Sequence, residues 1–269
     1  MNSIKKNNEY EKNSRSGMIK ITIAFLALLF CVTIDAQKDY TKSLEGIEWV
    51  KIESKANVTV KTHSSKQLLI KAGRSYGRTS ARAKGLKLVG EGGTDNTDVG
   101  FYVIKEGNNL IVKNLRKSRS AEIYLPADQN ISVKSTWQGN IKISNFKGEI
   151  EADAQLNGSI KVHEVSGPLT ANALNGTIEV IFSKVNQNSP ITVYTTNGAV
   201  DISLPEDTPA NITLGSTNGD IYTNFDLAVP DKNGLKAISS KRTGGSINNG
   251  GVKIKLRSTN GNIYLRKKS

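Results

Sequence analysis

The chain has 269 residues, a formal net charge of +13 at pH 7, one cysteine and two histidines. This length is enough for one large domain or two modest ones, and for a continuous buried core. One cysteine excludes a framework of intrachain disulfides, and two histidines far apart in sequence do not supply a histidine-based metal site. Packing and hydrogen bonds must therefore hold the fold together.

The first predicted element is an apolar run at residues 21–34, which directly follows Lys20. The run is shorter than the roughly twenty residues that a membrane-spanning helix needs. The positive charge before it and the small Ala36 after it are typical of a secretory signal. We therefore expect residues 1–36 to be a signal peptide that is cleaved before Gln37, where N-terminal sequencing of the exported protein would begin.

Two alternatives to a cleaved signal are disfavoured. A retained anchor would need a longer apolar run, and lipid attachment at Cys31 would need a small residue where Phe30 stands. Translation could start at Met1 or at Met18, and the later start gives a more compact signal. After cleavage the chain would keep 32 basic and 21 acidic residues, no cysteine and no transmembrane segment. We expect this mature chain in the periplasm, on the outer surface or secreted.

Residues 37–136 are predicted to form irregular β coils that cap a regular stack, because terminal repeats are usually atypical. Short alternating segments at 57–62, 67–70 and 121–126 predict strands. Residues 71–100 form a basic excursion between these strands. Among its basic residues are Arg74, Arg78, Arg82, Lys84 and Lys87.

Residues 137–269 carry an internal repeat in which Asn-Gly is followed by a short alternating apolar segment. A second alternating segment precedes each Asn-Gly, so each unit is predicted to be strand, turn, strand over about 20 residues. The glycines at 139, 158, 176, 198 and 219 are 19, 18, 22 and 21 residues apart, and two further periods, 42 residues, lead to Gly261. The repeated asparagines are Asn157, Asn175, Asn197, Asn218 and Asn260, with Gln138-Gly139 as an imperfect copy.

An Asn-Gly pair between two strands most often indicates an antiparallel hairpin, since both residues tolerate positive φ. The even period instead favours a solenoid, in which every coil places the same turn at the same position. We therefore predict an all-β fold, a single-chain parallel β-solenoid with Asn-Gly turns. Stacking of coils at about 4.8 Å would align Asn157, Asn175, Asn197 and Asn218 in one hydrogen-bonded column.

Alternation within the units predicts which side chains face the core and which face solvent. Lys161 and Glu179 are expected to form a weak ion pair on the outer face. The predicted inward columns are Ile141, Ile160, Ile178, Val200, Ile221 and Ile263, then Ile143, Val162, Val180, Ile202 and Leu265. The inward pairs before each Asn-Gly are Leu169 and Ala171, Ile191 and Val193, Ile212 and Leu214, and Ile254 and Leu256. The predicted outward row is Lys142, Lys161, Glu179, Asp201, Tyr222 and Tyr264.

The end of the repeat region contains two further basic features. Residues 224–251, with Lys241 and Arg242, are predicted to be a second excursion that fills one extra unit before Gly261. Residues 266–268 end the final strand with three positive charges. We expect this run to keep other chains from adding to an open sheet edge.

The chain resembles a known family in several motifs. These are the Asn-Gly-x-Ile-x-Val repeats behind a signal, the Leu125-Pro126 strand end before the first regular coil, and the closing segment 258–265. They are similar to the bacterial "putative adhesin" domains of unknown function, relatives of the head GIN-type β-solenoids. The resemblance covers nearly all of residues 40–267. It implies an envelope or surface protein with an adhesive role and no assigned catalytic residues.

Glu179 and Asp201 are the strongest candidates for catalysis, because they occupy the same position in successive units. Paired carboxylates about 5–9.5 Å apart can hydrolyse glycosides. No histidine or arginine is expected beside them, and the row holds lysine earlier and tyrosine later, which favours a solvated face. His63 and His163 are both predicted to be surface residues. The sequence has no Gly-x-Ser-x-Gly nucleophile motif and no phosphate-binding loop.

Residues 95–98 could offer oxygen ligands to calcium, but they lack the spacing of a calcium loop, so a polar turn is predicted. The sequence pI near 9.7 would also suit a protein that binds nucleic acid. The predicted export argues against nucleic acid as a partner. We expect contact with anionic polysaccharide or with another envelope or surface component, and no cofactor. The candidate contact residues are Arg74, Arg78, Arg82, Lys84, Lys87, Lys241 and Arg242.

The sequence thus predicts a non-enzymatic module that acts in adhesion or envelope interaction. A purely structural envelope component and a polysaccharide-active solenoid enzyme are the alternatives. Functional groups aligned in columns on one face would favour the enzyme, whereas featureless columns would favour binding or scaffolding.

Overall fold

A computed structural model describes residues 39–72, 81–83, 85–117, 119–227 and 242–268. By its internal contacts the chain divides into two units, Met1–Gln37 and Lys38–Ser269, and every described residue belongs to the second. The predicted signal peptide lies outside the described residues. Within the described part, no helix is long and apolar enough to cross a membrane.

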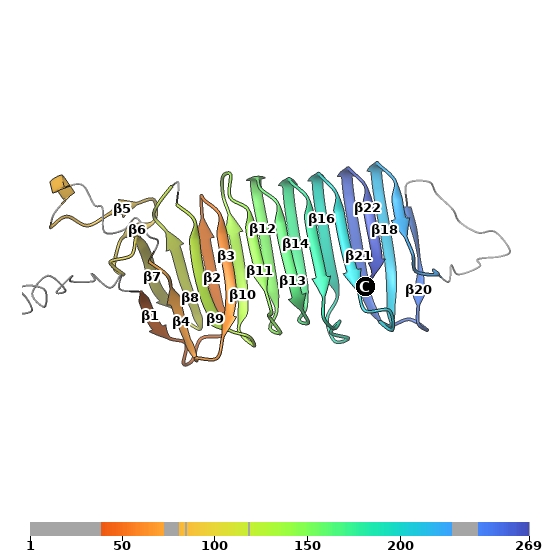
Figure 1. The fold of residues 1–269 in the computed structure, drawn as a ribbon, viewed down its shortest axis with the longest axis horizontal. Coiled ribbons are helices and arrows are strands. Elements are labelled where there is room, and N and C mark those ends of the chain that lie inside the picture. Colours follow the sequence, from red (N-terminus) through yellow and green to blue (C-terminus); the bar gives the residue numbers. More distant parts are fainter. Residues whose placement is uncertain (1–38, 73–80, 84, 118, 228–241, 269) are drawn as a thin grey trace, which may run out of the picture. The chain divides into compact units, whose positions relative to one another are not determined.

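Two ten-stranded sheets face each other along the described part of the second unit (Figure 1). Most coils contribute one strand to each sheet, and those strands pair in parallel with the coils on either side. Sheet A contains, in spatial order, β1 (Tyr40–Ser43), β4 (Gln67–Ile70), β9 (Ala121–Pro126), β3 (Val58–His63), β11 (Ile141–Ser144), β13 (Ile160–Val165), β15 (Ile178–Phe182), β17 (Val200–Leu204), β22 (Ile263–Lys267) and β19 (Ile221–Thr223).

Sheet B contains, in spatial order, β20 (Arg242–Ile247), β18 (Ala210–Asn218), β21 (Val252–Asn260), β16 (Ile191–Asn197), β14 (Leu169–Asn175), β12 (Ile150–Asn157), β10 (Asn130–Ser135), β2 (Trp49–Ser54), β8 (Asn109–Asn114) and β7 (Phe101–Glu106). A short hairpin, β5 (Val89–Gly90) with β6 (Gly93–Thr94), and the 3₁₀ turn η1 (Ala81–Ala83) lie between β4 and β7 in the chain. This arrangement confirms an all-β, β-solenoid-like fold with long parallel sheets.

The core lies between the two sheets and consists of the inward side of each alternating strand. Every predicted inward residue of the repeats is buried except Ile221, which is half-buried. Ile221 lies on β19, the edge strand of sheet A, where no further strand pairs with it among the described residues. The period-two pattern therefore identified the inward side correctly, because alternate side chains of a strand point to opposite faces of its sheet.

The asparagines of the Asn-Gly pairs form a ladder along one corner of the stack. Each side-chain amide donates to the next asparagine's Oδ1: Asn175 to Asn157 at 3.2 Å, Asn197 to Asn175 at 2.7 Å, Asn260 to Asn197 at 2.7 Å and Asn218 to Asn260 at 2.8 Å. The ladder corrects the expected order, since Asn260 lies between Asn197 and Asn218. The coil formed by β21 and β22 is inserted between the coils of β16–β17 and β18–β19.

Glycine is required beside each asparagine because the backbones of successive turns approach closely. A Cβ atom added at Gly176 would lie 2.1 Å from the carbonyl oxygen of Gly158. The oxygen is backbone, so the contact could be relieved only by separating the coils. A side chain at this position is therefore incompatible with the spacing of the stack.

The two ends of the sheets contain antiparallel strands, which corrects the expectation of a purely parallel solenoid. β20 pairs antiparallel with β18, so residues 242–247 cover one end of sheet B and do not fill an extra coil. At the opposite end, β7 pairs antiparallel with β8, and β4 pairs antiparallel with β1 and β9. Hairpin-like pairing lets the chain reverse where the stack ends.

The charged end of the last strand also has a different role from the one expected. β22 lies between β17 and β19 and is not an edge. Lys267 Nζ contacts Glu206 Oε1 at 2.7 Å, and Lys268 Nζ contacts Glu164 at 2.7 Å. These charges join the end of the chain to β13 and to the loop after β17. The expectation that they protect an open edge was therefore wrong.

Candidate functional site

The outer face of sheet A carries the charged row that the sequence suggested for catalysis. Glu179 accepts a hydrogen bond from Lys161 Nζ at 2.9 Å, and His163 Nε2 lies 2.7 Å from its other oxygen. The expected pair of Lys161 with Glu179 is therefore present. The expectation that no histidine stands beside Glu179 was wrong, because His163 comes two residues after Lys161 on the outer face of β13.

Asp201 is also held by a cation, which the sequence analysis did not expect. Arg266 donates from Nε to Oδ1 of Asp201 at 2.8 Å and from Nη2 to Oδ2 at 3.0 Å. The guanidinium lies 5.0 Å from the ring centroid of Tyr264, and Tyr264 stacks on Tyr222 at 5.2 Å with an interplanar angle of 11°. Arg266 is distant in sequence from Asp201, and only the insertion of the last coil makes them neighbours.

These contacts disfavour glycoside hydrolysis at the two carboxylates. The hydrogen bond from Lys161 is the main cause that lowers the pKa of Glu179, and His163 lowers it further. A general acid of this reaction class needs the opposite shift, a pKa raised toward neutrality. Both carboxylates of this row are therefore paired with neighbouring cations.

Asp95 organises the turn that could have been a calcium site. Its Oδ1 accepts hydrogen bonds from the backbone N–H and the hydroxyl of Thr97, both at 2.9 Å, and its Oδ2 accepts from the N–H of Gly100 at 2.9 Å. Asp95 is buried, at 4% exposure. Its carboxylate acts as an internal cap for the backbone of this turn. No group of three or more potential metal ligands occurs among the described residues.

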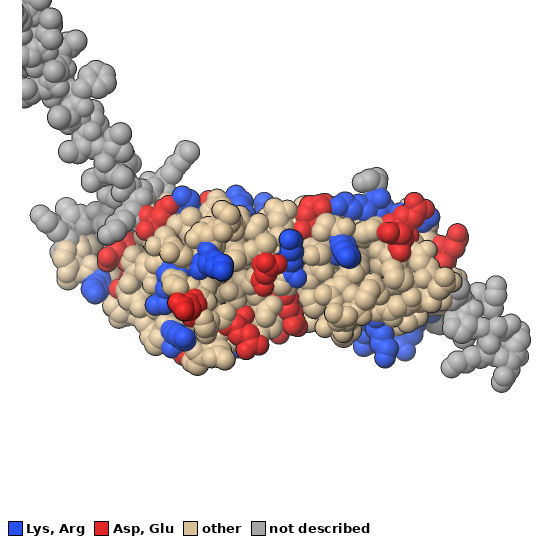
Figure 2. All heavy atoms as spheres, turned by 90° about the horizontal axis from the view of Figure 1, so that it is seen from below, with Lys and Arg blue, Asp and Glu red and all other residues tan. Residues whose placement is uncertain are grey.

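The predicted polyanion contacts are separated by the fold. Arg74, Arg78, Lys84 and Lys241 lie outside the described residues. Arg82 and Lys87 are exposed in the excursion next to β7, whereas Arg242 is exposed on β20, at the other end of sheet B. Nine strand spacings of about 4.8 Å separate these ends by roughly 40 Å. Figure 2 shows basic and acidic residues interspersed between the ends, with no broad area of one sign.

The outer face of sheet B contains a different feature, an open groove of about 890 Å³ that includes open solvent. It crosses β12, β14 and β16. Its lining residues are Thr136, Asp153, Ala154, Gln155, Leu156, Asn172, Ala173, Leu174, Tyr194 and Thr196. We call this feature the sheet B groove.

Apolar side chains line one side of the sheet B groove. Leu156 and Leu174 come directly before the ladder asparagines and are 37% and 40% exposed. Trp137, 56% exposed, precedes Gln138-Gly139 in the neighbouring coil, and its carbonyl accepts the N–H of Asn157 at 2.9 Å. With Tyr194, 38% exposed, these residues place one large exposed side chain in each of four successive coils. Contiguous exposed apolar surface of this kind marks interaction sites.

A bulge in β12 contributes to the shape of this surface. Ala154 pairs with Ala173 and Asn157 pairs with Asn175, so β12 has one residue more than β14 between these two pairs. The extra residue turns both Gln155 and Leu156 toward solvent. Bulges frequently redirect side chains beside functional sites.

The other side of the groove is a row of polar and aromatic groups. Asp153 pairs in register with Asn172, and Asn172 with Tyr194, so the three side chains lie next to one another on the outer face. Within the described part, the side chains of Asp153, Gln155 and Asn172 form no hydrogen bond with protein. Their donors and acceptors are available to a ligand.

The ring of Tyr194 is fixed by hydrogen bonds at its hydroxyl. Tyr194 Oη lies 3.1 Å from Thr259 Oγ1 and accepts from Thr196 Oγ1 at 3.3 Å. The hydrogen bond from Thr196 is the largest cause that lowers the pKa of Tyr194, followed by the contact with Thr259. Thr259 belongs to the inserted last coil, so the groove depends on the order of the coils.

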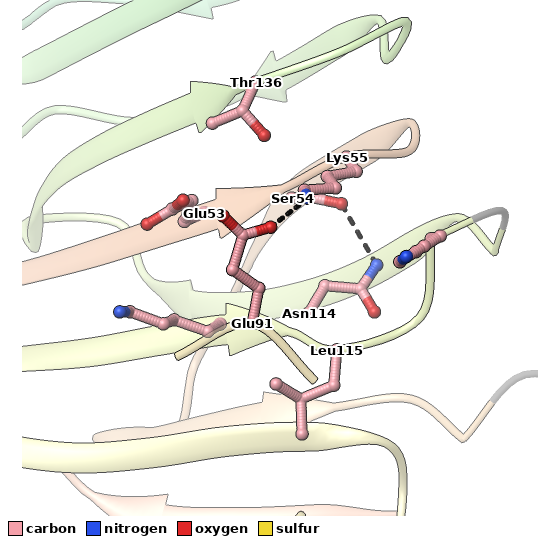
Figure 3. A pocket seen from close by; sticks show the side chains of 9 residues that line it. Glu53, Ser54, Lys55, Glu91, Asn114, Leu115 and Thr136 are labelled. Atoms are coloured by element: carbon pink, nitrogen blue, oxygen red, sulfur yellow. Dashed lines mark hydrogen bonds and ion pairs between the residues drawn. The ribbon is translucent and has the colours of Figure 1, made fainter. Parts of the chain in front are cut away.

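A second, smaller recess of about 400 Å³ lies between β2, β8 and the β5–β6 hairpin (Figure 3). Lys55 forms an ion pair with Glu91, and Asn114 Nδ2 donates to Ser54 Oγ at 3.0 Å. The hydroxyl of Thr136 is buried without a partner in the described residues. Half of the polar side chains that line this recess bind one another, which makes it a weaker candidate than the sheet B groove.

One signal in the sequence points to the groove. Leu174 occupies an outward position by alternation, yet it is large and apolar. Trp137 and Leu156 also come directly before a turn, but alternation along their strands places both inward, and Leu156 faces solvent because of the bulge in β12. The sequence pattern therefore predicts one exposed apolar residue of this surface, and the exposure of the other two depends on the tertiary structure.

Residues 138–266 match the model of the family described as Toastrack DUF4097. A putative cell adhesion protein from Clostridium sporogenes ATCC 15579 is similar in structure, with 12% sequence identity, 86% of this chain and 99% of that chain covered, and a TM-score of 0.46. A putative adhesin from Bacteroides fragilis NCTC 9343 is also similar in structure, with 11% sequence identity, 87% of this chain and 98% of that chain covered, and a TM-score of 0.39. No curated protein matches the chain. The relation to head GIN-type domains stays a prediction.

Proposed function

We propose that this chain is an exported, non-enzymatic β-solenoid that acts in adhesion or in contact with other components of the cell envelope. The observation that carries the proposal is the sheet B groove, which Leu156, Leu174 and Tyr194 line from three successive coils, with exposed Trp137 in the next coil. Large exposed apolar side chains that gather over several coils mark interaction surfaces in soluble proteins. The resemblance of the repeats to adhesin domains supports the same conclusion.

Two features of the fold suit this function. The parallel sheets are continuous along the stack, and the asparagine ladder joins their coils at one corner. A binding surface on such a scaffold is preorganised, so little conformational entropy is lost when a ligand binds. A purely structural envelope component would share the scaffold but would not need exposed leucines.

Anionic envelope polymers are a further partner in this proposal. The expected excess of 11 positive charges after signal cleavage favours their approach, although the attraction is not specific. Arg82 and Lys87 at one end and Arg242 at the other would contact separate parts of a long polymer. This contact is distinct from binding in the sheet B groove, and salt separates the two, because exposed charges are screened at high ionic strength.

The proposed function is tested with the full chain and isolated bacterial envelope fractions. Wild type should bind them, and a variant with Leu156→Thr and Leu174→Thr should bind more weakly with an unchanged melting temperature. The control, Lys87→Ser with Arg242→Ser, should lose only the part of the binding that disappears between about 0.05 and 0.5 M salt. Equal binding by wild type and the leucine variant would contradict the role of the groove.

A further inference from the structure

We propose that the sheet B groove binds a linear, uncharged polysaccharide that lies along the stack, across β12, β14 and β16. This inference rests on the proposed binding function and names its ligand class. Successive coils are about 4.8 Å apart, close to the length of one pyranose unit in an extended chain. Each sugar would then meet the corresponding position of the next coil.

The polar row matches the hydroxyl groups of sugars. The Asp153 carboxylate accepts hydrogen bonds from hydroxyls, while the amides of Asn172 and Gln155 can both donate and accept. Adjacent hydroxyls of a pyranose ring present the same mixture of donors and acceptors. These three side chains have no partner among the described residues, so binding would not require breaking a side-chain hydrogen bond within the protein.

The apolar side of the groove matches the faces of sugar rings. A pyranose exposes C–H groups on its faces, which pack against aromatic and aliphatic side chains. Leu156 and Leu174 provide such surface on one side of the groove, the ring of Tyr194 provides it on the other, and Trp137 adds to it in the neighbouring coil. The hydrogen bonds of Tyr194 to Thr196 and Thr259 hold its ring in place before a ligand arrives.

Charge favours a neutral ligand over an ionic one. Asp153 is the one carboxylate among the residues that line the groove, and no lysine or arginine lines it. An acidic polymer would be repelled by Asp153. Lys134, the register neighbour of Asp153 on β10, places a positive charge beside it and disfavours a strongly cationic ligand. In the same outward row, Glu53 adjoins Lys134 and Arg257 adjoins Tyr194. From Glu53 to Arg257 the row therefore holds two charges of each sign and is close to neutral.

The test is titration calorimetry of the full chain with cellohexaose, xylohexaose and mannohexaose. At least one of them should bind, with an affinity that changes little between about 0.05 and 0.5 M salt. The Tyr194→Ala and Asn172→Ala double variant should weaken binding by at least roughly tenfold. Tyr222→Ala is the matched control, an exposed tyrosine on sheet A, 49% exposed, and should bind as wild type does.

Two further measurements keep the result interpretable. Melting temperatures show whether each variant is folded, and Tyr194→Phe, which keeps the ring, should retain most of the affinity. Binding should also strengthen from the disaccharide to the tetrasaccharide, as more coils are contacted. Failure of all three hexasaccharides, or equal loss of affinity in Tyr222→Ala, would overturn the proposal.

The outcome also separates this inference from the proposed function. If oligogalacturonate or polylysine binds in a Tyr194-dependent manner while the neutral sugars do not, the ligand class is wrong and the binding function stands. If the leucine variant and wild type bind envelope fractions equally, the proposed function fails as well.

Discussion

The outer faces of the two sheets are made by the same coils but differ in how their side chains are satisfied. On sheet A, Glu179 and Asp201 are held by Lys161, His163 and Arg266. On sheet B, the groove exposes leucines and leaves the side chains of Asp153, Gln155 and Asn172 without hydrogen-bond partners in the described residues. A face with internal partners stabilises the fold, whereas a face without them is available for binding.

The largest expected loss of stability comes from a substitution in the core, which lies between the two sheets. Ile178 is fully buried between Ile160 and Val200. Ile178→Asp places an unpaired charge there and should cost several kcal/mol, enough to lose the folded state. Glu179→Ala, the next residue on the same strand, should cost about 1 kcal/mol or less because its ion pairs are exposed.

Urea denaturation of both variants measures this difference. Equal midpoints would contradict the assignment of inward and outward residues, and with it the register of the coils. The comparison between the two outer faces would then lose its basis, since both faces are defined by that register.

A matched pair of double variants sharpens the comparison itself. Glu179→Ala with Asp201→Ala removes the carboxylates of sheet A and should cost about 1–2 kcal/mol. Leu156→Thr with Leu174→Thr changes the groove and should stay within about 0.5 kcal/mol of wild type. Free energies of unfolding from denaturant titrations give both values. A larger loss for the leucine variant would mean that these side chains serve folding and not binding.

The smallest expected effect is a pH dependence confined to sheet A. The folded state lowers the pKa of Glu179. The contribution of Glu179 to stability is therefore complete above the usual pKa of a glutamate side chain and is lost as pH falls through the lowered pKa. The stability difference between wild type and Glu179→Gln, present at pH 7, should therefore shrink below about pH 4. Lys161 and His163 face this carboxylate, and Asp201 adjoins it in register.

Thermal melting of wild type and Glu179→Gln from pH 7 to pH 3 measures this difference in stability. The variant Leu156→Thr with Leu174→Thr serves as the control and should differ from wild type by the same amount at every pH, because it changes no titrating group. A constant difference for Glu179→Gln would show that the ion pairs of sheet A do not contribute to stability.

Local pattern in the sequence determined the repeat and the inward side of each strand. Ile178 and Glu179 were assigned to opposite faces from alternation alone, because that property depends only on neighbours along the chain. The pairing of Lys161 with Glu179 followed from the same pattern. Such features repeat with the units and can be predicted without knowing which coils are adjacent.

The order of the coils was decided only by the tertiary structure. The units that contain Asn218 and Asn260 have similar turns and similar strands, so either could stack on Asn197 with the same hydrogen bonds. The residues around the two turns do not distinguish stacking of the Asn218 unit from stacking of the Asn260 unit. The contact of Arg266 with Asp201 and the anchoring of Tyr194 by Thr259 both follow from that order. The charges of sheet A and the groove of sheet B thus depend on long-range packing, which the repeat pattern does not encode.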